Sequence, residues 1–217
     1  INSTYRLFKP TRKLLAIPTT AGSGAEVTEN AVIYINSVKY SVEGKYIKPN
    51  AYMLIPEFTK NASNSLKASA GFDSIAQSME SLISIKSNKT SVMYASNSLD
   101  LSLKYFPKFL KNPNTQNTYL MLKAANLSGK AISISKTTAP HAVSYPFSSK
   151  FNINHGHAVL LTLGKFLKFN FENINHSKSN FNLKNRFKII FEKTKSKNID
   201  EFTNYLNAIS KISNLET

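Results

Sequence analysis

From Pro56 onward, apolar residues recur along the chain with the period of an α-helix. The strongest example is the segment 68–85, whose apolar residues at i, i+4, i+7 and i+8 are Ile75, Met79, Leu82 and Ile83. Helices of this kind bury their apolar stripe against neighbouring elements, so the pattern predicts a helical domain. Further helices are expected at 57–64, 91–103, 118–134 and 157–169, and the tail 187–215 also fits helix formation.

Prolines and one polar stretch indicate where these helices should end. Pro107 and Pro113 are expected to stop the helix that begins at residue 91, because proline lacks a backbone N–H. Pro140 and Pro146 predict a broken stretch between two helices. Residues 170–185 are rich in Asn, Ser and Lys and predict a loop.

The first 55 residues contain short apolar runs between turn residues. Residues 13–17 and 51–55 each end at a proline and predict short strands. Residues 31–35 and 39–42 predict two strands joined as a hairpin. The predicted domains are a short α/β part, 1–55, and an α-helical part, 56–217.

The net charge of +16 would suit a nucleic-acid partner. However, only three of the 28 basic residues are arginines, and the lysines are dispersed along the chain. Proteins that read phosphates and bases depend on the forked guanidinium group of arginine. We therefore predict no nucleic-acid partner, and a local basic pocket for an anionic substrate stays open.

The chain contains no cysteine, which excludes disulfide and thiolate chemistry and fits a cytoplasmic protein. No apolar run reaches the ~18–20 residues that a membrane span needs, so we expect no membrane partner. The first residue is Ile1 rather than Met, and no signal peptide is visible. We expect the chain to be a fragment.

Asp73 and Gln77 stand four residues apart within the predicted helix 68–85, so their side chains share one face. Glu80 lies on the same face. Two interpretations remain open from spacing alone. The polar stripe could hold a metal ion, or it could simply face solvent.

His141 and His155 are separated by two prolines and cannot be neighbours on one helix. They can converge if the broken stretch between them folds back. His155 precedes Gly156 at the expected start of the next helix, where a ligand can project from a rigid end. Ordinary polar roles are the alternative for both residues, and His157 and His176 have no such support.

The loop 18–28 is rich in glycine and hydroxyl side chains. Glycine lets backbone N–H groups approach a phosphate, and hydroxyl groups donate hydrogen bonds to it. Gly22 and Gly24 lack a third glycine at position 27, so the dinucleotide-binding fingerprint is not met. A tight turn is the alternative.

Together, three segments resemble the iron-type (group III) alcohol dehydrogenases. IPTTAGSGAEVT resembles the family loop PTTxGTGSEVT, and GFDSIAQSMES resembles the helix GxDALxHxxE. PHAVSYPFSSKFNINHGHAV resembles HAxxHxxGxxxxxxHG. The order and spacing agree over residues 13–170. The resemblance implies a dehydroquinate synthase-like fold, in which the end of a Rossmann-like nucleotide domain precedes a helical metal-binding domain.

The resemblance also implies roles for individual residues. Asp73, His141 and His155 match three metal ligands and would be the catalytic residues, and Gln77 takes the fourth ligand position, which is usually His.

Thr19, Thr20 and Ser23 match the loop that contacts the phosphates and nicotinamide end of the cofactor, and Lys39 matches a lysine near its ribose. Tyr145 stands where many relatives have a second active-site His, which puts a proton relay there in doubt.

Gln77 and the segments KAANLSGKAISISKTTAPHAVSYP and HGHAVLLTLGKF resemble the phosphonoacetaldehyde reductase branch of the family. That branch reduces phosphonoacetaldehyde to 2-hydroxyethylphosphonate with NAD(P)H, which is a step of phosphonate biosynthesis. The phosphonate group requires cations or N–H donors. Lys136, Thr137 and Thr138 lie just before His141 and are the candidates, ahead of Lys130; a surface role is the alternative for Lys136.

A divalent metal, with Fe, Zn, Mn and Mg all open, would act as a Lewis acid toward the aldehyde oxygen as hydride arrives from the nicotinamide. An amide oxygen at Gln77 favours harder metals such as Mg²⁺ or Mn²⁺. Alternatively, Gln77 leaves the coordination shell and hydrogen-bonds a water or the substrate.

Two other functions remain open. One is a metal-dependent alcohol dehydrogenase of simple alcohols and aldehydes. The other is an inactive helical remnant, since the GGGS phosphate loop of the family's nucleotide-binding half is not in this sequence. A homodimer is compatible with the resemblance.

Overall fold

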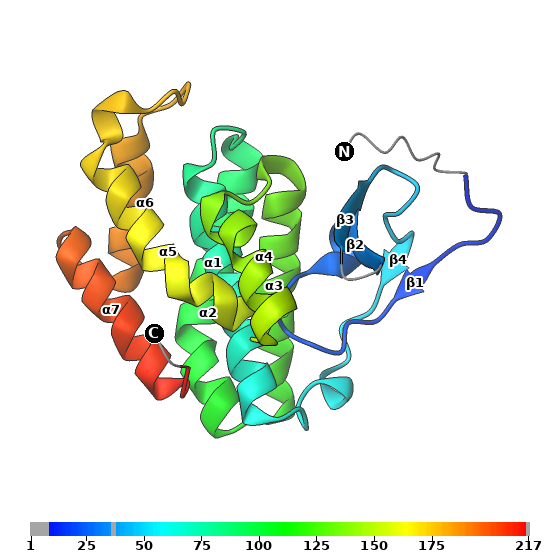
Figure 1. Cartoon of the computed structure of the whole chain (residues 1–217). Coiled ribbons are helices and arrows are strands. Elements are labelled where there is room, and N and C mark those ends of the chain that lie inside the picture. Colours follow the sequence, from blue (N-terminus) through cyan, green and yellow to red (C-terminus); the bar gives the residue numbers. More distant parts are fainter. Residues whose placement is uncertain (1–8, 36–37, 216–217) are drawn as a thin grey trace.

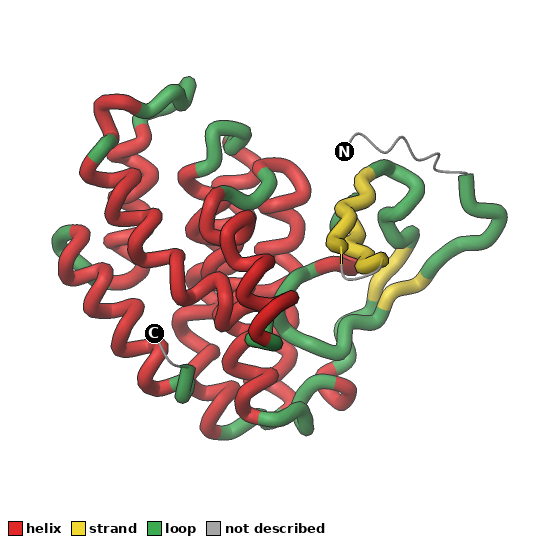
Figure 2. Tube along the Cα trace, in the orientation of Figure 1, coloured by secondary structure: helices red, strands yellow, loops and turns green. Residues whose placement is uncertain are grey.

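The computed structural model describes residues 9–35 and 38–215. A bundle of helices forms one side of this described part, and a small group of strands lies beside it (Figure 1). The loops that join strands to helices run between the two parts (Figure 2). None of the helices in the described ranges is long and apolar enough to cross a membrane.

The strands form two separate pairs. β1 (Leu15–Ala16) pairs in parallel with β4 (Ala51–Tyr52). β2 (Asn30–Ile35) pairs antiparallel with β3 (Val38–Glu43), in a register that places Ile33 opposite Tyr40. The predicted hairpin is therefore confirmed, although the turn at residues 36–37 lies outside the described residues. The two predicted outer strands exist but are only two residues long.

Helix α1 (Asn64–Ile83) is the centre of the bundle and packs against α2 (Lys89–Lys111), α3 (Thr115–Ser135) and α5 (His155–Glu172). It starts where the Ser63 hydroxyl accepts a hydrogen bond from the backbone N–H of Leu66. Because helices surround it, α1 buries its polar residues as well as its apolar ones. The interpretation of its polar stripe as a solvent-facing surface is wrong.

The helix predicted at 57–64 is wrong in type. That segment starts with a short 3₁₀ turn, η2 (Pro56–Phe58), and α1 begins only after Ser63.

Pro107 lies inside α2, so the predicted stop at this residue is wrong. An internal proline costs a helix ~3 kcal/mol. The side chains of Phe106 and Phe109, on either side of it, are almost completely buried, and each contributes about 1.5–3 kcal/mol. Packing therefore outweighs the local penalty.

The stretch predicted to be broken by Pro140 and Pro146 is in fact helix α4 (Ala139–Phe151). Pro140 lies in the first turn, where no backbone N–H is needed, and Pro146 faces outward. The helix ends at Asn152, which adopts a left-handed conformation with φ 54°. This turn reverses the chain into α5.

The last third of the chain contains more helix than predicted. α5 continues to Glu172 into the expected loop, which also contains a 3₁₀ turn, η3 (Ile174–His176). The tail forms two helices, α6 (Leu183–Thr194) and α7 (Ile199–Ile212), because Lys195 is left-handed and Asn198 caps the next helix. Their buried Phe187 and Phe202 join the core that surrounds α1.

Candidate metal centre

Asp73 and Gln77 lie on adjacent turns of α1, and both side chains are buried. The amide nitrogen of Gln77 donates to Oδ2 of Asp73 at 3.1 Å. The amide oxygen of Gln77 accepts from the hydroxyl of Ser128 on α3 at 3.0 Å. The two side chains therefore lie on the same face of the helix, as their spacing of four residues predicts, and are joined by a hydrogen bond.

His141 and His155 both approach Asp73. Nε2 of His141, on α4, lies 3.1 Å from Oδ1 of Asp73, and Nε2 of His155 lies 4.0 Å from the same oxygen. The two imidazole rings meet edge to face with centroids 5.4 Å apart. The chain reversal at Asn152 brings them together, where the sequence predicted a broken stretch.

Gly156 explains why the start of α5 can approach α1 so closely. A Cβ atom at this position would lie 1.9 Å from the carbonyl oxygen of Ser69 and 3.0 Å from Cβ of Asp73. In addition, the Ser69 hydroxyl accepts from the backbone N–H of His157 at 3.2 Å, which satisfies a free donor of the first helical turn. Sequence reasoning noted Gly156 but not this contact.

These residues fit a divalent metal. One ligand atom from each of Asp73, His141 and His155 lies within 4.8 Å of the others. Ligands of a zinc-type ion stand about 2.0–2.2 Å from it, so two ligands of one ion lie at most about 4.4 Å apart, and these side chains would close slightly around a bound ion. Two imidazoles and one carboxylate form a donor set that suits Fe, Zn and Mn.

The charge around His141 is unusual. Burial alone would lower the pKa of its imidazole, but the negative charge of Glu80 and hydrogen bonds to Asp73 and Glu80 outweigh burial and raise this pKa to about 10. A cation that binds Nε2 must displace this proton. The same carboxylates that hold the proton therefore provide a negative environment for a metal ion.

Sequence reasoning placed Glu80 on the same face as Asp73 but gave it no role. Its side chain is completely buried, and Oε1 contacts Nδ1 of His141. Tyr145 contributes differently, because its ring stacks on that of His155 at an interplanar angle of 4°. The only sequence signal for Glu80 was its position two turns after Asp73 on the same helical face.

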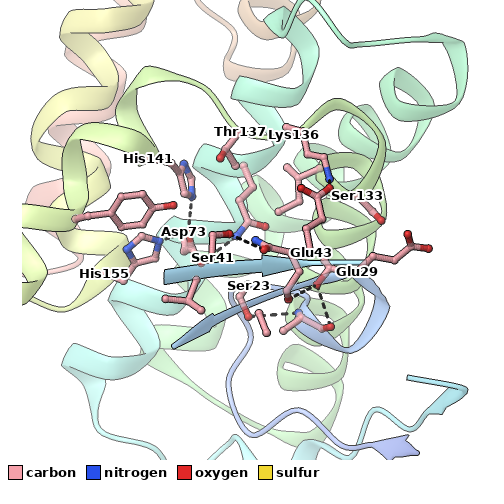
Figure 3. A pocket seen from close by; sticks show the side chains of 18 of the residues that line it. Ser23, Glu29, Ser41, Glu43, Asp73, Ser133, Lys136, Thr137, His141 and His155 are labelled. Carbon is pink, nitrogen blue, oxygen red and sulfur yellow. Dashed lines mark hydrogen bonds and ion pairs between the residues drawn. The ribbon is translucent and has the colours of Figure 1, made fainter. Parts of the chain in front are cut away.

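A cavity of about 700 Å³ opens beside the three ligand side chains. Figure 3 shows Asp73, His141 and His155 at one end, with the strands of the hairpin passing beneath. Ser23, Glu43, Lys136 and Thr137 also line the cavity. Its size lies within the range of sites for small molecules and cofactors.

The loop predicted to bind a cofactor lines an adjoining cavity of about 430 Å³, with Thr19 and Thr20 on its wall and Ser23 shared by both cavities. Gly24 has φ +61° and lies against Gly129 of α3, where a Cβ atom would be 2.4 Å from the Ala125 carbonyl oxygen. The loop is thereby fixed to the bundle. Lys39 lies in β3, and its side chain is outside the described part of the structure.

The three residues predicted for a phosphonate group separate in the structure. Lys136 and Thr137 line the cavity, and Nζ of Lys136 forms an ion pair with Glu43 of the hairpin. Thr138 instead donates through its backbone N–H and its hydroxyl to Oε2 of Glu80, at 2.5 and 2.7 Å. Lys130 donates to the Tyr52 hydroxyl.

Comparison with known proteins shows the family, and the chain belongs to the iron-containing alcohol dehydrogenases. The family model described as "Fe-containing alcohol dehydrogenase family, C-terminal" matches residues 67–217. The model described as "Iron-containing alcohol dehydrogenase" matches residues 2–56. The resemblance seen in the sequence is confirmed.

Among curated relatives, the phosphonoacetaldehyde reductase of Streptomyces viridochromogenes is 31% identical over 164 residues, which are 74% of this chain and 42% of that protein. The long-chain-alcohol dehydrogenase 1 of Geobacillus thermodenitrificans is 27% identical, over 74% of this chain and 42% of its own length. The match thus covers less than half the length of each of these relatives.

Among solved structures, the sulfoacetaldehyde reductase from Bifidobacterium kashiwanohense in complex with NAD⁺ matches with a TM-score of 0.86. It is 25% identical, and the match covers 100% of this chain and 56% of that one. An archaeal alcohol dehydrogenase, ADH/D1, matches with a TM-score of 0.88 at 20% identity and supports the fold.

Proposed function

We propose that this chain is part of a metal-dependent, NAD(P)H-linked reductase, which converts an aldehyde to an alcohol. The observation that carries the proposal is the convergence of Asp73, His141 and His155 beside a cavity that the Thr19–Thr28 loop also lines. The metal-holding residues would be Asp73, Gln77, His141 and His155. The cofactor would contact Thr19, Thr20, Ser23 and Lys39.

When bound, the divalent metal supplies Lewis-acid stabilisation of negative charge on the aldehyde oxygen, and the nicotinamide supplies the hydride. The protein's own residues determine where this chemistry takes place. Asp73 is held by the amide of Gln77, which leaves Oδ1 facing the two imidazoles. Tyr145 supports the partly exposed ring of His155 by stacking on it.

Phosphonoacetaldehyde is the substrate we propose, with Lys136 and Thr137 as the residues that receive its phosphonate. Two relatives are named for two-carbon aldehydes that carry an anionic group, one a phosphonate and one a sulfonate. Lys136 has φ 60° and ψ 172°, a conformation that costs a residue with a side chain about 1–3 kcal/mol. Such strain persists at sites where it aims a functional group, and here Lys136 lines the cavity. The anionic group would compete with Glu43 for Nζ.

The test is a reductase assay on the purified chain with Fe²⁺, Zn²⁺, Mn²⁺ or Mg²⁺ and either NADH or NADPH. We expect phosphonoacetaldehyde to be reduced faster than a neutral aldehyde of similar size. Turnover of neither aldehyde under any of these conditions would contradict the proposal and favour a helical remnant without activity.

Lys136→Ala tests the phosphonate assignment directly. Loss of a charge-assisted hydrogen bond should raise KM for phosphonoacetaldehyde about 10- to 100-fold and leave KM for propionaldehyde unchanged. Lys130→Ala is the matched control, because Lys130 contacts Tyr52 and is not among the cavity-lining residues. An unchanged KM in Lys136→Ala would reject the assignment.

A second candidate function is the oxidation of simple alcohols. Two relatives are named for long-chain alcohols and 1-propanol, and the cavity wall includes the apolar side chains of Val32 and Ile132. Equal efficiency with neutral and phosphonate-bearing aldehydes would favour this function.

A further inference from the structure

Glu80 is a buried acid that neither the metal-ligand set nor the substrate assignment uses. Its side chain is 0% exposed, at the centre of the bundle. A carboxylate there is tolerated only if its oxygens accept hydrogen bonds. Oε1 contacts Nδ1 of His141, and Oε2 accepts from the backbone N–H and the hydroxyl of Thr138. Both oxygens of Glu80 are thus committed to named partners.

The position of Glu80 relative to Asp73 places the imidazole of His141 between two carboxylates. The two acids lie two turns apart on the same face of α1, and the ring of His141 lies between them. Nδ1 faces Glu80, and Nε2 faces Asp73. When Nδ1–H donates to Glu80 and a cation has displaced the proton of Nε2, the lone pair of Nε2 is directed toward the side of Asp73 and the nearby ring of His155.

We propose that Glu80 is a positioning residue for the metal centre, which fixes the tautomer and ring orientation of His141. Carboxylates that accept from the second nitrogen of a histidine ligand orient the ring and raise its basicity. Through Thr138, Glu80 also ties this histidine to the strained residue Lys136. The inference rests on the part of the proposed function that assigns metal binding to His141.

A purely structural role makes different predictions. Thr138 is the N-cap of α4, so the charge of Glu80 would also stabilise the start of that helix. If this were its whole role, removing the charge would lower the unfolding temperature and leave the metal affinity of the folded protein unchanged. The two roles are therefore separated by a measurement of metal binding on folded protein.

The experiment measures Co²⁺ binding by the 217-residue chain in its visible absorption spectrum, for the wild-type protein and Glu80→Gln. Glutamine has one acceptor oxygen, so either Nδ1–H of His141 or the donors of Thr138 must face an amide N–H₂. We expect Co²⁺ to bind about 10- to 100-fold more weakly. Glu26→Gln is the matched control, since Glu26 is also a buried acid but accepts its hydrogen bond from Asn126 on α3.

A second readout is the ¹⁵N NMR spectrum of the imidazoles in the Zn²⁺-loaded protein. We expect the wild-type protein to show a slowly exchanging proton on Nδ1 of His141, and Glu80→Gln to lose it while the signals of His155 persist. Wild-type Co²⁺ affinity together with an unchanged His141 signal would overturn the inference.

If the Glu80→Gln variant does not fold, the variant Thr138→Val provides a second test of the proposal. It removes one hydroxyl contact to Glu80, and we expect a several-fold loss of Co²⁺ affinity and a shifted Nδ1–H signal. No change in either quantity would overturn the proposal. Neither readout uses an aldehyde or a nicotinamide, so a Glu80-dependent metal site in a chain that reduces no aldehyde would reject the reductase function alone.

Discussion

The amide of Gln77 contacts Asp73 through its nitrogen and Ser128 through its oxygen. In this orientation the side chain orients a ligand. Rotation of the amide by half a turn would instead present its oxygen toward the ion. Ligation by Gln77 is one of its two predicted roles, whereas its contact with Asp73 differs from the other, a hydrogen bond to water or substrate. Ligation and orientation of Asp73 differ in which metals the site would prefer.

Gln77→His should shift this preference toward borderline metals. An imidazole adds a nitrogen donor, so we expect the affinity for Zn²⁺ to rise at least about tenfold relative to that for Mn²⁺. Competition titrations with a chromophoric chelator measure both affinities. An unchanged ratio of the two would mean that position 77 does not reach the ion.

The pKa of His141 predicts that metal uptake depends on pH. Since this pKa is raised to about 10 by Glu80 and Asp73 against the effect of burial, metal binding near pH 7 should release about one proton from His141, and affinity should rise with pH up to about 10. In the metal-free protein, the folding stability contributed by His141 changes with pH in the opposite direction to the metal affinity. The stability contributed by His141 is complete below about pH 6.5 and is lost as pH rises toward 10.

Calorimetric titrations of Zn²⁺ in two buffers with different ionisation enthalpies count the released protons, and unfolding in urea across this pH range follows the stability. Binding without proton release near pH 7 would show that His141 is already neutral there.

At the scale of elements, the start of α5 is fitted against α1, and glycine makes the fit possible. Gly156→Ala would place a methyl group into the Ser69 carbonyl, so we expect about 1–3 kcal/mol of destabilisation and weaker metal binding as His155 moves away from Asp73.

Gly164→Ala is the control in the same helix. Its added Cβ would meet only the tip of Leu206 at 3.5 Å, an ordinary contact, and the change should stabilise the helix by about 0.5–1 kcal/mol. Urea unfolding curves of both variants provide the comparison. Equal stabilities would show that α5 does not depend on the close approach.

The elements also show which sequence signals were reliable. The hairpin and the long helices were predicted because their periodicity is local. The stop at Pro107 and the broken stretch between Pro140 and Pro146 were wrong. Burial of Phe106 and Phe109 in one case and the outward-facing position of Pro146 in the other are tertiary facts. The ligand set came from a family resemblance, whereas the partners of Glu80 depend on how α4 meets α1 and could not be read from spacing.

For the molecule as a whole, stability should be unevenly distributed. α1 is surrounded by helices, whereas β1 and β4 have two residues each and lie largely exposed. Local unfolding of the bundle would therefore expose more apolar surface than local unfolding of the strands.

Hydrogen exchange should reveal this difference. We expect amides of α1 to exchange only through global unfolding, and amides of the β2–β3 hairpin to exchange roughly 100-fold faster or more. Mass spectrometry of peptides from both regions measures the two rates. Similar protection in both would mean that strands and bundle open as one unit.

Asp73, His141 and His155 come from three different helices, α1, α4 and α5. During synthesis, Asp73 leaves the ribosome long before His155, and the first two helices of the bundle can form while only one ligand is available. A nascent chain thus offers no complete site that an unsuitable ion could occupy. If these residues hold a metal as proposed, selection of the ion would wait until α5 has docked and all three candidate ligands are in place.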